Sequence, residues 1–358
     1  MMLNKILHSS CTKFINFFSL CLFMAIEKFK VTVIGGGTGS FTMLSGLKNY
    51  PDIDLAAIVA MTDDGGSSGV LRDELGALPP GDSRQCLVAL SESEEIWRKL
   101  FTHRFTKGSL DGQNFGNLFI SALEQITGSF EKALELAGEI LKTKGKVIPV
   151  TLDNTRLVAE TESGNFIIGE HKIDLKEEPI KSISFQPKPS PNPEAIRRIL
   201  QSDAVVIGPG DVYTSILPNL LVDGIADALR DTKAVKIYIC NIMTQKNHTH
   251  NFKVIDFVSL FEKLLGEGIF DVVIYNTKEP SQKFLESYAY EEEYPVRFDP
   301  EDFKGKKIIF IGEDLLSEKI PQISKGDKLN RALIRHDPFK TASLIYRVLK
   351  TKSQRLHL

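Results

Sequence analysis

Short apolar runs alternate with amphipathic stretches along most of the chain from Phe29 onward. The runs are rich in β-branched residues and are apolar at successive positions, which is typical of strands that helices cover on both faces. Strands that alternate with helical stretches predict an α/β fold with a mostly parallel sheet and crossover helices. The expected strands are Val31–Gly35, Ala56–Met61, Ala204–Gly208, Lys236–Asn241, Asp271–Asn276 and Lys307–Gly312.

The alternation changes between the second and the third expected strand. Amphipathic stretches come first, and residues 146–186 then show a strand pattern with a turn at Ser163-Gly164-Asn165. We expect an inserted helical lobe and a small β-meander over about residues 80–190, closed by a proline-rich connector at 186–193. The expected helices of the lobe are Ser83–Leu100, Gly116–Ile126 and Phe130–Leu141.

The first 25 residues are a compositional anomaly. Two lysines lead into the apolar run Phe14–Ala25 without any acidic residue. A signal peptide has this form, but cleavage there would leave almost no spacer before the first strand. We therefore favour a translation start at Met24 and treat residues 1–26 as a leader, outside one domain of residues 27–350. The run is shorter than the roughly 20 apolar residues that a bilayer requires, so we expect no stable membrane span.

Composition and charge narrow the class of protein. With 42% hydrophobic and 25% charged residues among 358, the chain is an ordinary globular protein, which excludes wholesale disorder and a membrane-embedded transporter. The 44 basic and 46 acidic residues leave a net charge of -2, so we expect no nucleic acid as partner. Four widely spaced cysteines indicate reduced thiols and a cytoplasmic location.

Loops of small polar residues follow three of the expected strands. In an open parallel sheet, ligands bind outside the carboxyl ends of the strands, so these loops are expected to meet at one crevice of a Rossmann-like, doubly wound sheet. Glycine lets backbone amides approach an anion closely, and a helix that begins after the loop adds its partial positive charge, so the expected ligand group is phosphate. The loops are Gly35-Gly36-Gly37-Thr38-Gly39-Ser40, Asp63-Asp64-Gly65-Gly66-Ser67-Ser68-Gly69 and Gly208-Pro209-Gly210-Asp211, the last followed by Thr214 and Ser215.

The charged residues of the second loop have several readings. One carboxylate of Asp63 and Asp64 could hydrogen-bond a ribose, or the pair could hold Mg²⁺ against a phosphate. Turn formation is the structural alternative for both, and we favour ligand contact for at least one of them. Arg72 could supply a charge to a phosphate, or pair with Asp73 or Glu74.

Later strands are followed by further candidates. Asp211 suits either an anion site or a helix N-cap. Asn241 could read a base or a sugar edge, although a turn explains it as well. Arg335 could reach the crevice, whereas His336 is expected to be a structural hydrogen-bonding residue and Asp337 the N-cap of the last helix.

Two histidines stand close together in a polar segment, residues 245–251. The spacing of His248 and His250 could bind a metal on a strand, but we favour a solvated loop. We assign neither a metal ligand nor a catalytic residue there.

Six motifs in order and spacing resemble one family. From about Lys30 to about Leu349 the chain resembles the gluconeogenesis-factor (YvcK-like) branch of the CofD-like superfamily, which also contains 2-phospho-L-lactate transferases. Three of the six are the loops above, the last continued by Tyr213–Asn219. The other three are Pro79-Pro80-Gly81-Asp82 with Arg84, Gly116-Asn117-Leu118 and Val150-Thr151, and the resemblance also includes Cys240–Gln245.

The resemblance implies a nucleotide-linked ligand in the crevice. For the first branch it implies a UDP-sugar, notably UDP-N-acetylglucosamine, and support of cell-wall synthesis and cell shape on gluconeogenic carbon sources, with no assigned reaction. For the second it implies Mg²⁺-dependent transfer of a phospholactyl group from a guanylylated donor to a deazaflavin. Two positions depart from the family pattern: Ser40-Phe41 replaces a small or aliphatic pair, and Asp211 stands where serine or asparagine is common.

Two functions remain in competition, with an NAD-binding protein as a third that Ser40 weakens, since it stands where the dinucleotide fingerprint has its third glycine. In the regulatory nucleotide-sugar binder, the glycine loops hold the diphosphate, Asp63 or Asp64 the ribose or a metal, and Asn241 and Arg335 the base or sugar. Asn117 joins this ligand-binding set through the resemblance. A transferase needs an apolar, aromatic acceptor pocket, and the single tryptophan, Trp97, favours the binder. The oligomeric state, including a homo-oligomer, stays open.

Overall fold

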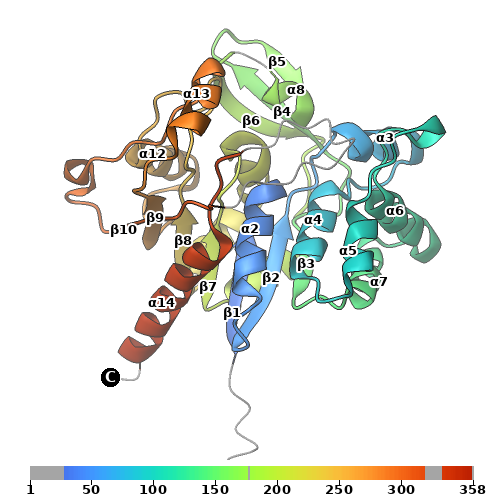
Figure 1. The fold of residues 1–358 in the computed structure, drawn as a ribbon, viewed down its shortest axis with the longest axis horizontal. Helices are drawn as coiled ribbons and strands as arrows, with labels where there is room; N and C mark the ends of the chain where they lie inside the picture. The colour runs from blue at the N-terminus through green and yellow to red at the C-terminus, as the bar shows by residue number, and fades with distance from the viewer. Residues whose placement is uncertain (1–27, 176–177, 319–332, 357–358) are drawn as a thin grey trace, which may run out of the picture.

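The computed structural model describes residues 28–175, 178–318 and 333–356. The leader expected at 1–26 lies outside these residues. Seven strands form one sheet in the order β10-β9-β8-β7-β1-β2-β3, and all neighbours pair in parallel (Figure 1). The expected α/β, mostly parallel fold is confirmed. The strands are β1 (Phe29–Ile34), β2 (Ile53–Val59), β3 (Lys146–Pro149), β7 (Ala204–Ile207), β8 (Val235–Ile239), β9 (Val272–Asn276) and β10 (Ile309–Glu313).

Helices cover both faces of the sheet, as the continuously apolar strands require. Along β2, Leu55, Ala57 and Val59 pack into one layer of the core, while Ala56 and Ile58 pack into the other. The first layer contains α2 (Gly37–Leu47), α4 (Gly81–Leu90), α7 (Phe130–Leu141) and α14 (Pro338–Leu356); the second contains α9 (Pro193–Leu200), α10 (Leu217–Leu220), α11 (Ile225–Asp231) and α12 (Val254–Leu265).

The direction of winding reverses between β1 and β7. The chain runs from β1 to β2 and β3 on one side, then returns to β7 beside β1 and continues through β8, β9 and β10 on the other. Such a reversal leaves a crevice outside the carboxyl ends of the two central strands, where ligands of doubly wound sheets bind.

A second, antiparallel sheet has the order β5-β4-β6 and lies beyond the carboxyl ends of the main strands (Figure 1). The meander expected from Lys146 therefore begins later than predicted, because β3 pairs with β2 at the edge of the main sheet. A four-residue edge strand and a meander strand have the same short apolar pattern, so the sequence did not separate them. The small sheet comprises β4 (Arg156–Thr161), β5 (Phe166–Ile168) and β6 (Ile180–Gln186), with α8 (Glu170–Asp174) attached.

The expected lobe is also part of the main core. α4 and α7 pack on the sheet in the same layer as α2, so the helical segment is the crossover from β2 to β3. The remaining helices are α3 (Gly66–Leu75), α5 (Glu95–Thr102), α6 (Phe115–Thr127) and α13 (Gln282–Tyr290), with short turns η1 (Gly108–Leu110), η2 (Val212–Ile216) and η3 (Pro300–Phe303). Within the described residues, none of the helices combines the length and the apolar character that crossing a bilayer demands.

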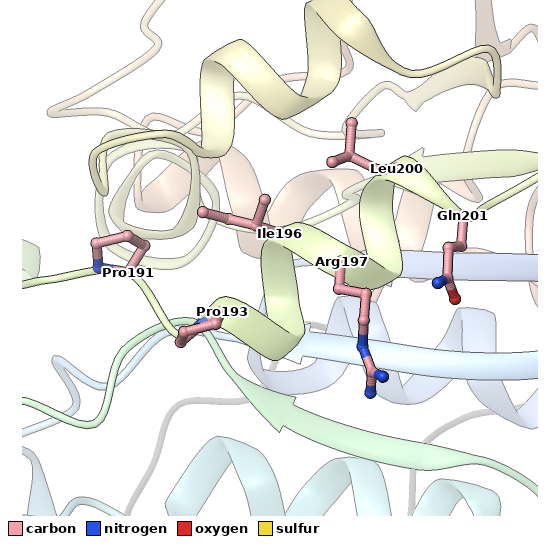
Figure 2. A pocket seen from close by; sticks show the side chains of 6 residues that line it. All are labelled: Pro191, Pro193, Ile196, Arg197, Leu200 and Gln201. Atoms are coloured by element: carbon pink, nitrogen blue, oxygen red, sulfur yellow. The ribbon is translucent and has the colours of Figure 1, made fainter.

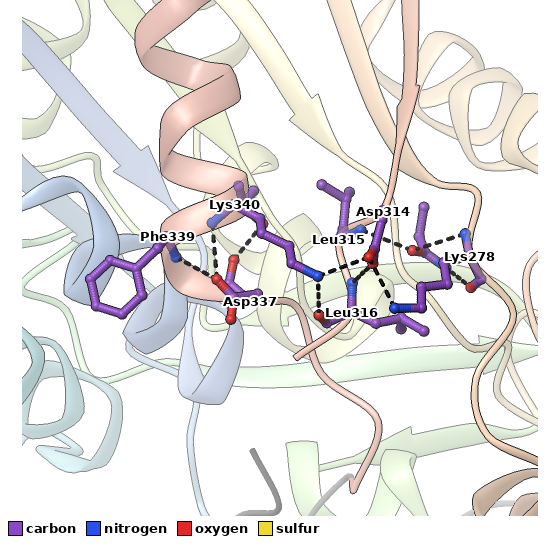
Figure 3. A network of polar contacts seen from close by, with 9 residues as sticks. Lys278, Asp314, Leu315, Leu316, Asp337, Phe339 and Lys340 are labelled. Carbon is purple, nitrogen blue, oxygen red and sulfur yellow. Dashed lines mark hydrogen bonds and ion pairs between the residues drawn. The ribbon is translucent and has the colours of Figure 1, made fainter. Parts of the chain in front are cut away.

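The last helix is fixed at its first turn by the network in Figure 3. Asp337 Oδ1 accepts hydrogen bonds from the backbone N–H groups of Phe339 and Lys340, both at 2.9 Å, so Asp337 is the N-cap that the sequence predicts. The Lys340 ammonium reaches Asp314 Oδ2 at 2.9 Å, and Lys278 reaches the same oxygen at 3.1 Å. These contacts join the start of α14 to the ends of β9 and β10.

Candidate functional site

The two loops at the reversal point touch through their backbones. A Cβ atom on Gly39, in the first turn of α2, would overlap the carbonyl oxygen of Pro209. The side-chain amide of Asn241, at the end of β8, donates to the Gly210 carbonyl oxygen at 2.9 Å and accepts from the Gly210 N–H at 3.4 Å. The carboxyl ends of β1, β7 and β8 are therefore joined at one point, and Asn241 uses both of its amide atoms to align the loop after β7.

Two of the helices that begin at this edge have glycine N-caps. These are Gly36 for α2 and Gly65 for α3, and neither residue has a side chain that could cap its helix. In α2 the N–H of Gly37 is bonded to Asp82 Oδ1 at 2.8 Å. Backbone N–H groups of a first helical turn that lack such caps are well suited to an anion. Ser40 lies beside them, fully buried, and its hydroxyl has no hydrogen-bond partner among the described residues.

A group of carboxyl side chains faces these loops. Asp63 Oδ1 accepts the Gly65 N–H at 3.0 Å, and Asp82 Oδ1 accepts the Gly37 N–H at 2.8 Å. Burial raises the pKa of Asp63; burial and the charge of Asp63 raise the pKa of Asp82 to about 7. Burial, then Asp63, holds the pKa of Glu170 well above its usual range. We call Asp63, Asp82 and Glu170 the crevice carboxyls.

Two members of this group were not among the predicted site residues. Asp82 begins α4 and was quoted only as part of a family motif, which was the available signal. Glu170 arrives from α8 of the small sheet. No local pattern indicates Glu170, because its position depends on how the small sheet lies over the main one.

The neighbouring aspartates have different contacts. Asp64 Oδ1 accepts the backbone N–H of His171 at 2.9 Å, and Asp64 Oδ2 lies 3.5 Å from Arg156 Nη1. Both partners belong to the small sheet and its helix. Asp63 therefore faces the crevice, whereas Asp64 fastens the small sheet to the loop after β2.

Arg72 is only 4% exposed, and one of its three side-chain nitrogens is bonded within the fold. Its Nη2 donates to Asn154 Oδ1 at 2.6 Å and also to the carbonyl oxygen of Thr155. Burial lowers the pKa of this guanidinium. Asp73 pairs with Arg156. Nε and Nη1 of Arg72 have no hydrogen-bond partner among the described residues, and contact of Arg72 with a phosphate stays a prediction.

Asn117 and the serines of the second loop join α3 to α6. Asn117 Oδ1 accepts from Arg84 Nε at 2.8 Å, and its Nδ2 donates to Ser68 Oγ at 3.4 Å. Ser67 Oγ donates to Gln113 Oε1 at 2.8 Å. These bonds hold the start of α3 in place, which fixes the direction of its backbone N–H groups.

The segment before α14 lies against the ends of β8 and β10. His336 is buried, and its Nε2 lies 3.0 Å from the carbonyl oxygen of Cys240. Burial lowers the pKa of His336 to about 4, so the ring is neutral and structural, as expected. The Arg335 carbonyl oxygen accepts the Ser317 N–H at 2.9 Å; contact of its side chain with a ligand stays a prediction.

Asp211 is the N-cap of η2, as one of its expected readings has it. Its Oδ1 accepts the N–H groups of Tyr213 at 2.9 Å and Thr214 at 2.8 Å. Its Oδ2 lies 3.6 Å from Nδ1 of His248. The solvated-loop expectation is wrong for His248, which the fold buries against Asp211, and correct for His250, which is exposed.

An apolar groove of about 390 Å³ lies on the outside of α9, away from these loops (Figure 2). It shares no residue with the predicted site, and its lining offers one charged side chain. The lining residues are Pro191, Pro193, Ile196, Arg197, Leu200 and Gln201. The groove therefore gives no reason to move the candidate site from the crevice.

Comparison with known proteins identifies the family. The family model described as 2-phospho-L-lactate transferase CofD matches residues 31–316. The chain belongs to the CofD family. Within this family it is similar to the gluconeogenesis factor of Bacillus subtilis (strain 168), with 39% identity over 90% of this chain and 99% of that protein. A relative from Thermoanaerobacterium thermosulfurigenes is 44% identical over 90% of this chain and 97% of its own length.

A solved structure extends the likeness to the fold of this CofD-family chain. The crystal structure of a UPF0052 family member from Bacillus halodurans is 37% identical, covers 89% of this chain and 99% of that one, and has a TM-score of 0.83. The expected gluconeogenesis-factor, CofD-like membership and Rossmann-like sheet are thus confirmed.

The predicted residues of the CofD-family chain separate into two sets. One set lies at the crevice. It consists of the loops after β1, β2 and β7, which offer backbone N–H groups, and of Asp63, which offers its carboxyl group. Asp64, Arg72, Asn117 and Asn241 support those loops from behind through the contacts given above. Direct contact of either set with a ligand remains a prediction.

Proposed function

We propose that this CofD-family chain binds a nucleotide sugar of the UDP-N-acetylglucosamine type and acts as a regulatory gluconeogenesis factor that supports cell-wall synthesis and cell shape on gluconeogenic carbon sources. The observation that carries the proposal is the pair of helices α2 and α3, which begin at one crevice with glycine N-caps, residues that have no side chain to cap the helix. Their N-termini supply hydrogen-bond donors and partial positive charge, which suits a diphosphate. A single diphosphate held in this way needs no surplus of lysine and arginine.

We infer that a divalent cation binds beside the same crevice. Burial raises the pKa values of Asp63, Asp82 and Glu170, and the charge of Asp63 adds to the effect at the other two. Mg²⁺ prefers oxygen ligands and commonly joins one or two carboxylates to substrate phosphates. When bound, such an ion supplies the positive charge that lets these groups ionise beside a diphosphate. Asp63, the residue that the sequence indicated, would hold it together with the phosphate oxygens.

The alternative is a Mg²⁺-dependent 2-phospho-L-lactate transferase with a deazaflavin acceptor. Two observations favour it: the description of the matched family and the presence of the crevice carboxyls. Incubation with Mg²⁺, a guanylylated phospholactate and a deazaflavin tests it. A new phosphodiester product would reverse the order of the two proposals.

Thermal unfolding with added ligand tests the binder. UDP-N-acetylglucosamine is expected to raise the melting temperature, and GDP or NAD to raise it less. Thr38, the second residue of α2, provides a matched pair of variants. Thr38→Pro removes a backbone N–H that the first helical turn leaves unbonded, whereas Thr38→Val removes only the hydroxyl.

We expect Thr38→Pro to lose most of the ligand-induced shift and Thr38→Val to keep most of it. The melting temperature of each variant without ligand serves as the folding control. Absence of any shift at millimolar UDP-N-acetylglucosamine in the unmodified chain would remove the proposal.

A further inference from the structure

Three side chains of types that can ligate a metal come together near the crevice. Asp174 ends α8 of the small sheet, Asp211 opens η2 after β7, and His248 lies in the loop after β8. One oxygen of each carboxylate and one ring nitrogen of the histidine all lie within 4.8 Å of one another. Three separate elements therefore bring two oxygen donors and one nitrogen donor to a single point.

The histidine of this set is buried, and one of its two ring nitrogens has no hydrogen-bond partner among the described residues. The His248 side chain is 3% exposed, and its Nδ1 lies 3.6 Å from Asp211 Oδ2, within ion-pair distance. Its Nε2 is buried with no hydrogen-bond partner among the described residues. Buried polar atoms of folded proteins are nearly always bonded, so a ring in this state points to a ligand for one of its nitrogens.

The Asp211 carboxylate, which faces this ring, also has one buried atom without a hydrogen bond. Asp211 uses Oδ1 to cap η2, while Oδ2 is buried and has no hydrogen bond within the part of the chain that the structure describes. Zinc bonds of about 2.0–2.2 Å at a tetrahedral angle place two ligand atoms about 3.3–3.6 Å apart. The 3.6 Å between Asp211 Oδ2 and His248 Nδ1 is close to that separation.

Asp174 completes the set from the opposite side. It comes from the small sheet, and its side chain remains accessible to solvent, which leaves a route for an ion and a place for water in its shell. Two carboxylates this close repel each other unless a cation lies between them. An ion there would join the small sheet to the loop at the reversal point.

We propose that Asp174, Asp211 and His248 bind one divalent transition-metal ion, of the zinc type, separately from any Mg²⁺ at the crevice carboxyls. An imidazole nitrogen beside two carboxylates suits zinc and similar ions, whereas Mg²⁺ and Ca²⁺ favour oxygen ligands throughout. The proposal does not depend on nucleotide binding.

Metal titration of the full chain tests this site. The protein is freed of metal by a chelator, dialysed into buffer with excess Mg²⁺ to fill any all-oxygen site, and titrated with Zn²⁺ by calorimetry and with Co²⁺ by visible absorption. We expect one ion per chain. Asp211→Asn keeps the oxygen that caps η2 but loses the charge, and His248→Asn loses the nitrogen donor; each should weaken binding at least about tenfold.

Two controls make the outcome decisive. His250→Asn changes an exposed histidine two positions away in the same loop and should bind zinc like the unmodified chain. Melting temperatures in chelator show whether each variant is folded. Failure of the unmodified chain to bind zinc stoichiometrically, or equal binding by His248→Asn, would overturn the proposal and leave an ion pair between His248 and Asp211.

Discussion

At the scale of single residues, neighbours in sequence have unlike roles in this molecule. Asp63 faces the crevice with a raised pKa, while Asp64 holds the backbone of His171 in the small sheet. Successive residues of an extended loop point in different directions, so a pair of like residues divides between ligand side and scaffold side. Neighbours within helix α2 also differ: Ser40 is buried beside the loops, whereas Phe41 is exposed.

Asp82 supplies a prediction on pH. Burial and Asp63 raise its pKa to about 7, so between about pH 4, where a carboxyl group titrates in the unfolded chain, and pH 7 the folded protein holds a proton that the unfolded chain releases. Stability due to this group therefore falls as pH rises through that window, and the whole penalty is present above pH 7. Asp82→Asn keeps an oxygen for the Gly37 N–H and cannot ionise. We expect it to raise the free energy of unfolding by about 1–2 kcal/mol at pH 8 and to change it little at pH 4.

Urea unfolding at several pH values, with chelator present, measures the effect. Asp223→Asn, which changes an exposed carboxylate, should show no such trend. Equal stability differences for Asp82→Asn at pH 4 and pH 8 would contradict the assignment of the penalty to Asp82.

The sequence predicted residues whose roles are local and missed those whose roles depend on packing. Asp337 as an N-cap and His336 as a structural ring follow from their position before a helix. Glu170 and His248 have no local signal, since each becomes part of the crevice only when a distant element packs over it. The two hydrogen bonds of Arg72 escaped prediction for the same reason: their acceptors, Asn154 and Thr155, are about eighty positions away.

At the scale of elements, the reversal point depends on close contact between two backbones. A methyl group on Gly39 would overlap the Pro209 carbonyl oxygen, which cannot move without shifting the loop after β7. A Cβ on Gly210, in that same loop, would meet its nearest atoms at 3.6 Å, which is ordinary contact. These two glycines therefore form a matched pair.

We expect Gly39→Ala to lower the free energy of unfolding by about 2–3 kcal/mol and Gly210→Ala to lower it by less than about 1 kcal/mol. Chemical denaturation of both variants provides the numbers. A Gly39→Ala protein as stable as Gly210→Ala would show that the contact between the loops is looser than described.

The element boundaries that the sequence misplaced share one cause. Main-sheet strands buried on both faces were recognised from their continuous apolar runs, but β3 is an edge strand of four residues whose first residue is exposed. Its membership of the main sheet follows from its register with β2, which pairs Ala56 with Lys146. Register between segments about ninety positions apart is a property of the packed sheet and is absent from the local pattern.

At the scale of the whole molecule, the candidate site lies between two bodies of the same chain. The main sheet supplies the loops, and the small sheet supplies Glu170 and rests on Asp64 (Figure 1). A ligand in the crevice is expected to slow opening of both sides at once.

Hydrogen exchange followed by mass spectrometry tests this expectation. Saturating UDP-N-acetylglucosamine should reduce exchange about tenfold or more in peptides covering residues 35–40, 65–69, 170–174 and 208–214. Peptides over α9, which carries the outer groove, serve as the internal control and should not change. Protection confined to α9 would place the ligand in the groove of Figure 2 instead.

The pairing of β1 with β7 also has a consequence for the order of events during synthesis. The backbone N–H of Lys30 is bonded to Asp203, 173 positions later. The second neighbour of β1 is β7, which is synthesised only after more than half of the 358 residues. Contacts this distant in sequence form slowly, and chains emerge from the ribosome amino end first. A truncated or stalled chain can therefore build β1, β2 and the helices on them but only half of the crevice. Ligand binding would then distinguish finished molecules from fragments.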